Sequence, residues 1–309
     1  MKATVIQNVA NRYKVIDEED NMHICIARGK LKNNNQVLNK REENALKLAT
    51  NYGKINTLTP VAGDKVEIEN EAIIKIYERT NYIKRPKIAN VTQVVFVVSL
   101  KEPEPDILML DKQLAFAENM GIKSIIVLNK CDLADCSNLK NVYEKVGYTV
   151  LETQAKNNVG VDKLKDYLKE NITVFSGNSG VGKSTIINSL FGKNITEEGL
   201  VSEKNKRGKN TTTAVTLYEL EKNTYIADTP GFSTFDINEI DYKNLDKEFI
   251  DFIPFIQDCK YVGCSHIYES EKECGVKRAV LDGKISKSRY ENFVKIYKEL
   301  EENYKRRYN

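Results

Sequence analysis

Short segments in which apolar and polar residues alternate occupy the first quarter of the chain. They include residues 4–6, 13–16, 23–26 and 65–68, and a long polar stretch between the last two predicts a loop. Alternation with a period of two is typical of half-buried strands, and several short strands at close spacing favour a small β-barrel. We therefore predict a β-barrel domain at residues 1–80.

A different pattern follows the basic connector at residues 81–87. Apolar runs at 94–98 and 125–128 are typical of parallel strands buried on both faces, and residues 111–120 between them have the period of an amphipathic helix. The alternation then continues, with helices expected at 162–170 and from Lys183, and strands expected at 173–175, 216–220 and 224–227. Strands that alternate with helices predict an α/β domain, which we place at residues 81–240.

The last part of the chain, residues 241–309, combines a helical start, a group of cysteines with one histidine, and a polar helix from Lys287. We predict a third, mostly helical domain here. A multidomain chain agrees with the length of 309 residues, because single domains usually contain about 100 to 200 residues.

Charge and composition exclude some classes of partner. The 47 Lys and Arg residues nearly balance the 44 Asp and Glu residues, so the net charge of +3 creates no strong field toward nucleic acid or membranes. Any contact with RNA must come from local basic patches. No apolar run approaches the roughly 18 to 20 residues that cross a bilayer, and the start lacks the apolar run of a signal peptide. We expect a cytoplasmic monomer that does not bind membranes.

A phosphate-binding loop is the strongest motif. The segment Gly177-Asn178-Ser179-Gly180-Val181-Gly182-Lys183-Ser184 follows an apolar strand and precedes a predicted helix that continues with Thr185. Glycines let backbone N–H groups turn toward phosphate oxygens, and the helix N-terminus adds positive potential. Lys183 would bridge the β- and γ-phosphates, and Ser184 would bind Mg²⁺. The alternative, a chance glycine-rich turn, is disfavoured by the flanking strand and helix.

Two further segments supply what a nucleotide hydrolase needs at the γ-phosphate. Asp228-Thr229-Pro230-Gly231 follows a predicted strand, which places the Asp228 carboxylate beside the metal and allows the Gly231 N–H to reach the γ-phosphate. Residues 211–213 are three threonines, and we expect Thr212 to bind Mg²⁺. The sequence leaves open which threonine acts, and the three also fit a strand.

A second motif predicts which base of the nucleotide is recognised. It is Asn129-Lys130-Cys131-Asp132, at the end of the 125–128 strand. The Asp132 carboxylate can accept hydrogen bonds from both N1–H and N2–H₂ of guanine, while the Lys130 stem covers the ring. Adenine has no such pair of donors, which opposes an ATP-dependent kinase or ATPase. In Thr153-Gln154-Ala155-Lys156 the Ala155 N–H is a candidate for the last base contact, although this segment also fits an ordinary turn.

Four residues near the C-terminus have the number, softness and spacing for one structural zinc: Cys259, Cys264, His266 and Cys274. The alternative is buried thiols beside an incidental histidine. Six cysteines are too few and too unevenly placed for a disulfide framework. Cys25, Cys131 and Cys136 have no comparable ligand neighbours, and we interpret them as packing or incidental residues.

The motifs occur in a permuted order, because the guanine segments precede the phosphate loop, which precedes the threonines and Asp228. With a barrel before them and a Cys/His domain after them, they resemble the ribosome small-subunit-dependent GTPase A family of circularly permuted GTPases. The resemblance covers nearly the whole chain, including residues 85–91. It implies an OB-fold barrel, a zinc domain, and Mg²⁺ with the nucleotide. It also implies late maturation of the small (30S) ribosomal subunit, rRNA binding, and hydrolysis of GTP to GDP and phosphate stimulated by that subunit.

Three positions depart from expected patterns. Lys209-Asn210 stands where the family often has a histidine, and Phe232 stands where many GTPases have a water-orienting glutamine. The gap from Cys264 to Cys274 is longer than the family pattern, so spacing supports Cys274 least among the zinc ligands. We predict slow hydrolysis by the isolated chain.

Four groups of basic residues are candidates for contact with rRNA: Lys84, Arg85 and Lys87; Lys204, Lys206, Arg207 and Lys209; Lys277 and Arg278; and Lys305, Arg306 and Arg307. Each group alone also fits an ordinary solvated face. A second reading of the chain is an RNA-binding module that senses nucleotide with little catalysis.

Overall fold

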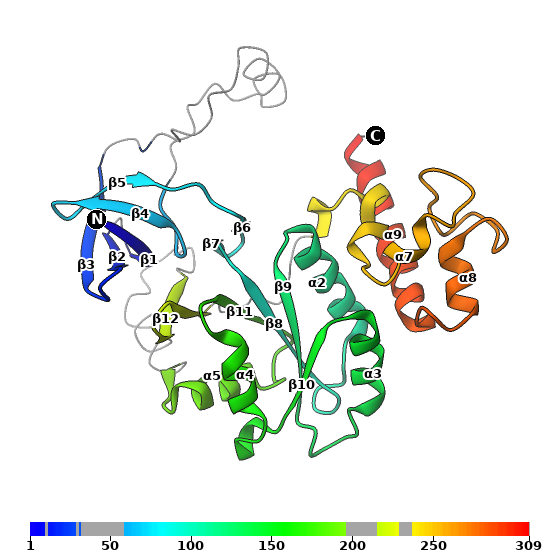
Figure 1. Ribbon diagram of the computed structural model, residues 1–309, viewed down its shortest axis with the longest axis horizontal. Coiled ribbons are helices and arrows are strands. Elements are labelled where there is room, and N and C mark those ends of the chain that lie inside the picture. The colour runs from blue at the N-terminus through cyan, green and yellow to red at the C-terminus, as the bar shows by residue number, and fades with distance from the viewer. Residues whose placement is uncertain (10–11, 29–30, 32–58, 196–214, 229–236, 309) are drawn as a thin grey trace, which may run out of the picture. The chain divides into compact units, whose positions relative to one another are not determined.

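The computed structural model describes residues 1–9, 12–28, 31, 59–195, 215–228 and 237–308. The described chain forms two compact units (Figure 1). The first contains residues 1–91 and the strand pair at 216–228, and the second contains residues 92–195 and 237–308.

Five strands of the first unit close into a barrel: β1 (Lys2–Val9), β2 (Arg12–Asp17), β3 (Met22–Ala27), β4 (Lys65–Glu69) and β5 (Ala72–Ile76). β1 pairs with β2 and β2 with β3, β3 pairs with β5, β5 with β4, and β4 returns to β1. The alternating pattern points residues such as Val5, Val15 and Ile73 into the barrel, where they are fully buried. The predicted OB-like barrel is confirmed.

Two hairpins complete this unit. β12 (Thr216–Glu221) and β13 (Thr224–Asp228) are antiparallel, and β12 joins β1 through the pairing of Thr216 with Gln7. The basic connector expected at 81–87 contains a short hairpin, β6 (Tyr82–Lys84) with β7 (Lys87–Ala89).

The second unit begins with four parallel strands in the order β10-β9-β8-β11. Their bounds are β8 (Gln93–Ser99), β9 (Lys123–Asn129), β10 (Thr149–Thr153) and β11 (Ile172–Ser176). Every residue of β8 and β11 is buried, because helices cover both faces of the sheet. Figure 1 shows α2 (Ile107–Asn119) and α3 (Ser137–Val146) on one side, and α4 (Val161–Leu168) and α5 (Lys183–Phe191) on the other. The predicted α/β architecture is confirmed.

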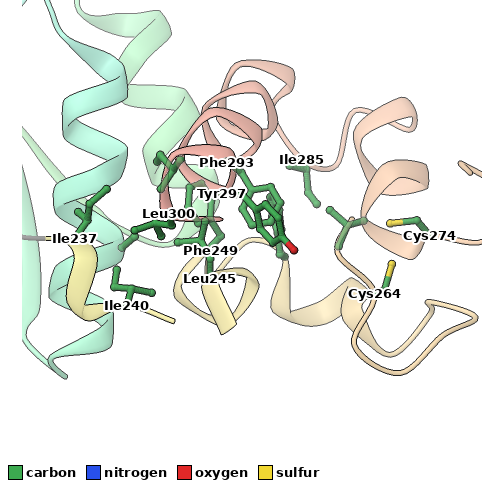
Figure 2. Close-up of a cluster of buried hydrophobic side chains, with 14 of the residues drawn as sticks. Ile237, Ile240, Leu245, Phe249, Cys264, Cys274, Ile285, Phe293, Tyr297 and Leu300 are labelled. Atoms are coloured by element: carbon green, nitrogen blue, oxygen red, sulfur yellow. The ribbon is translucent and has the colours of Figure 1, made fainter. Parts of the chain in front are cut away.

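The C-terminal region, residues 237–308, consists of short helical segments and one long helix. They are η2 (Ile237–Glu239), η3 (Tyr242–Glu248), α7 (Ile253–Ile256), α8 (Gly275–Leu281) and α9 (Lys287–Tyr308). One apolar cluster joins these segments (Figure 2), with Cys264 and Cys274 at the end away from Ile237. The Phe293 ring lies at its centre, 4.8 Å from Phe252 and 5.3 Å from Phe249 between ring centroids. The mostly helical character that we predicted for this region is confirmed.

A buried ionic network attaches α9 to the sheet region. The Arg289 guanidinium, 2% exposed, donates two hydrogen bonds to the Asp251 carboxylate at 2.9 and 2.7 Å and one to Asp111 of α2 at 2.5 Å. Asp111 also accepts hydrogen bonds from Tyr143 of α3 and Asn292 of α9. Burial raises the pKa of Asp111, and the positive charge of Arg289 opposes that rise. The network therefore holds α2, α3 and α9 together by contacts that no local pattern predicts.

No described helix combines the length and apolar character needed to span a bilayer.

Candidate nucleotide site and metal centre

The phosphate loop lies between β11 and α5, as the motif predicts. Gly177, Gly180 and Gly182 have φ angles of 141°, 81° and 102°, in the region that favours glycine. A Cβ atom on Gly177 would lie 2.2 Å from the Val97 carbonyl oxygen, and one on Gly182 would lie 2.2 Å from Asn129 Nδ2. Both glycines are therefore required by close packing as well as by backbone conformation.

Lys183 is folded back over this loop. Its Nζ donates hydrogen bonds to the carbonyl oxygens of Gly177 at 2.7 Å and Asn178 at 2.8 Å. Burial lowers the pKa of Lys183, since the ammonium is partly removed from water. Ser184 and Thr185 are exposed in the first turn of α5, where helix N–H groups lack partners within the helix. This combination of a half-buried cation and a helix N-terminus suits a phosphate anion.

Asn129 connects three loops at the carboxyl ends of the strands. It is the last residue of β9 and is 2% exposed. Its Nδ2 donates to the Val181 carbonyl oxygen in the phosphate loop at 2.9 Å, while its Oδ1 accepts from Thr153 Oγ1 at 2.9 Å and from the Ala155 N–H at 3.1 Å. The guanine motif, the phosphate loop and the 153–156 segment are thus braced by a single side chain. The sequence placed Asn129 in the guanine motif but did not predict this role.

The loop after Asn129 presents Asp132 to solvent. Lys130 has a φ angle of 62°, and its carbonyl oxygen accepts a hydrogen bond from the Leu133 N–H at 2.9 Å, which closes a tight turn around Asp132. The Lys130 ammonium donates to the Glu102 carbonyl oxygen. An exposed carboxylate above a turn can meet the donor edge of a base, as the motif predicts.

Cys131 and Cys136 form a disulfide, and our interpretation of them as packing or incidental residues was wrong. The turn after Lys130 reverses the chain, so these two residues, five apart in sequence, have Cα atoms only 6.0 Å apart. The signal that sequence reasoning missed was a second cysteine just beyond a turn.

The remaining predicted nucleotide residues are only partly described. Asp228 ends β13 in the first unit. Thr212 and Gly231 lie outside the described residues, as do Lys209, Asn210 and Phe232.

The four predicted zinc ligands form one cluster. The donor atoms of Cys259, Cys264, His266 and Cys274 all lie within 4.8 Å of one another, and all but the half-buried Cys259 are buried. Figure 2 shows the sulfur atoms of Cys264 and Cys274 turned toward each other. The longer gap before Cys274 therefore does not separate it from the other three.

The surroundings of the cluster favour metal binding. His266 turns Nδ1 toward the sulfur atoms of Cys274, 3.3 Å away, and Cys259, 3.6 Å away. Its Nε2 lies 3.4 Å from the Asp246 carboxylate, an arrangement that fixes the ring of metal-binding histidines. Burial alone would raise the pKa of Cys274, but hydrogen bonds from His266 and from the Lys277 N–H bring it to about 7. The sequence analysis did not predict this contact of Asp246 with the cluster.

Comparisons with known proteins agree with this geometry. The model of a family described as RsgA GTPase matches residues 76–238. A protein of Ruminiclostridium cellulolyticum named small ribosomal subunit biogenesis GTPase RsgA is 41% identical over 256 residues, which cover 80% of this chain and 83% of that protein. A protein of Clostridium botulinum strain Loch Maree with the same name is 37% identical over 309 residues, 97% of each chain.

Two solved structures are similar throughout. YjeQ from Thermotoga maritima has a TM-score of 0.74 and 33% identity, covering 97% of this chain and 98% of that one. YloQ, described as a circularly permuted GTPase, has a TM-score of 0.76 and 27% identity, covering 98% of this chain and 95% of that one.

Proposed function

Because this chain belongs to the RsgA GTPase family and is therefore a GTP-hydrolysing enzyme, we propose that it uses GTP in late maturation of the small (30S) ribosomal subunit. Its curated relatives are named for biogenesis of that subunit. The structural observation that carries the use of GTP is the brace made by Asn129, which joins a guanine motif to a phosphate loop at one edge of the sheet.

The phosphates of GTP would bind to the backbone N–H groups of the phosphate loop and to Lys183. To reach them, the Lys183 ammonium exchanges its hydrogen bonds with Gly177 and Asn178 for phosphate oxygens. This exchange replaces neutral carbonyl acceptors by charged phosphate oxygens, and hydrogen bonds between two charged groups are stronger. Guanine would bind to Asp132 and Lys130, and the segment that contains Ala155 and Lys156 would supply the last contact to the base.

Hydrolysis needs a metal and a positioned water. Ser184 and Thr212 would bind Mg²⁺ with the support of Asp228, and Mg²⁺ would neutralise charge on the β- and γ-phosphate oxygens. The Gly231 N–H would hold the γ-phosphate. Phe232 offers no polar group to orient water, so we expect slow hydrolysis by the chain alone and acceleration when the subunit completes the site.

The Cys/His cluster would hold one structural Zn²⁺. It supplies four protein ligands, which fills a tetrahedral site and leaves no open position for a substrate. The metal would therefore stabilise the C-terminal region and take no part in hydrolysis.

The basic residues differ in their availability to rRNA. Lys277 and Arg278 donate to backbone carbonyl groups around the metal cluster, such as those of Ile267 and Asp258, so their role is structural. Lys305 and Arg306 form exposed pairs with glutamates of α9, which exchange for phosphate at little cost. We propose that rRNA contacts involve this end of α9 and the hairpin residues Arg85 and Lys87. The chain would act as a cytoplasmic monomer.

The test is single-turnover hydrolysis of GTP with and without purified small subunits. The proposal requires faster hydrolysis with intact subunits than with the chain alone. Equal rates would overturn a subunit-stimulated GTPase and favour a nucleotide-sensing RNA-binding module.

A further inference from the structure

The guanine loop carries the only disulfide among the residues that the structure describes. Cys131 is the third residue of the guanine motif, and Cys136 directly precedes α3. Their Cα separation of 6.0 Å lies in the usual range for disulfides. The bridge encloses Asp132, the residue that would read the base.

Within this loop the Leu133 N–H donates to the Lys130 carbonyl oxygen at 2.9 Å, and further non-covalent contacts lie at its two ends. At one end the Cys131 N–H donates to the Thr153 carbonyl oxygen at 3.3 Å. At the other, the Asp135 carboxylate accepts hydrogen bonds from the N–H and hydroxyl of Ser137 at 2.9 and 2.6 Å. Asp132 is exposed between them, and the disulfide is the covalent tie that joins the residue before Asp132 to the start of α3.

The two cysteines differ in exposure. Cys131 is half-buried, whereas Cys136 is 4% exposed. A small dithiol can therefore attack Cys131 Sγ, and Cys136 leaves as a thiolate that takes up a proton. The second thiol of the reductant then displaces Cys131, so the products are two protein thiols and one oxidised, cyclic disulfide. A small-molecule disulfide reverses the exchange and accepts the same two electrons.

We propose that Cys131 and Cys136 form a reversible thiol–disulfide site that sets the affinity of the guanine loop for GTP and GDP, an inference that rests on the proposed nucleotide site. With the bridge closed, Asp132 is held near its binding geometry before the nucleotide arrives. Once the bridge is reduced, nucleotide binding must order the loop, which weakens the affinity. In a reducing compartment a disulfide is usually transient and redox-sensing, which fits a reversible site.

The test compares the full-length, metal-loaded chain after treatment with glutathione disulfide and after treatment with a dithiol. Metal content is measured in both samples, because the Cys/His cluster also contains thiols. We expect fluorescent GDP to bind about five- to tenfold more weakly to the reduced chain. Amide hydrogen exchange at residues 130–136 without nucleotide should also be faster in the reduced chain.

Two variants assign the response. Cys136→Ser should bind GDP like the reduced wild-type chain under both treatments, whereas Cys25→Ser, which changes a buried cysteine in the barrel, should keep the full response. Equal affinity in both redox forms, or a response that survives in Cys136→Ser, would overturn the inference. If neither form bound GDP, the nucleotide site itself would be refuted, and this inference with it.

Discussion

The sheet region and the C-terminal region are stabilised in different ways. Strands β8 and β11 are buried at every position, and helices on both faces make a continuous apolar core. The C-terminal region has short helical segments, and it adds a metal cluster and the buried Arg289 network to its apolar core. The comparison teaches where each region is vulnerable: the sheet rests on continuous apolar burial, whereas the C-terminal region adds a metal cluster and an ionic network to a smaller core.

Removal of the metal should give the largest effect. Cys274→Ser removes a buried ligand, and structural zinc sites contribute about 10–16 kcal/mol of apparent binding free energy in small zinc-finger peptides. We expect loss of bound metal and fast amide hydrogen exchange in residues 253–285, with protection kept in β8 and β9. Cys25→Ser is the matched control and should retain the metal. If protection fell equally in β8, the two regions would not differ in the way we describe.

Loss of the buried cation should come next. Arg289→Met leaves two buried carboxylates, Asp111 and Asp251, without their partner, and breaking a buried pair in this way costs about 3–5 kcal/mol. Chemical denaturation should show this loss. Arg306→Met, at an exposed position of the same helix, should change stability by less than about 0.5 kcal/mol. A small effect of Arg289→Met would mean that apolar packing alone attaches α9.

Asp132→Asn should change binding without changing stability. The substitution removes a charged acceptor for two guanine donors, so we expect GTP to bind about a hundredfold more weakly, a loss of about 3 kcal/mol. Xanthosine triphosphate, which presents an acceptor at the second position, should gain relative to GTP. The melting temperature should stay the same because Asp132 is exposed. An unchanged preference for GTP would show that another residue reads the base.

Asn129→Ala should lower both the stability of the chain and its affinity for nucleotide, each by less than the changes above. It leaves the Val181 carbonyl, the Thr153 hydroxyl and the Ala155 N–H without their partner, which costs about 1–3 kcal/mol. We expect a modest fall in stability together with weaker binding of both GTP and GDP, measured by denaturation and by nucleotide titration. Weaker binding at full stability would make Asn129 a simple ligand and not a brace.

Prediction from sequence worked where a motif is local. The phosphate loop needs glycines, a lysine and a following helix within a few residues, so Gly177 to Lys183 could be placed before the fold was known. It failed where neighbours come from distant segments. α3 was not predicted although Leu139, Val142, Tyr143 and Val146 have the spacing of one helix face, so this was an oversight in reading the pattern. Asp246 was missed because it lies 20 residues from the histidine it contacts.

The sequence by itself determined the chemistry of this protein: a GTPase motif set in permuted order, a barrel before it and four soft ligands after it. These follow from residue types at short spacing, which fix local backbone and donor atoms. The tertiary structure decided which groups meet. Only the parallel sheet brings Asn129 to the phosphate loop, only the packing of α9 buries Arg289 between two aspartates, and only the turn after Lys130 joins Cys131 to Cys136. Such contacts depend on chain geometry over long distances, which residue spacing does not record.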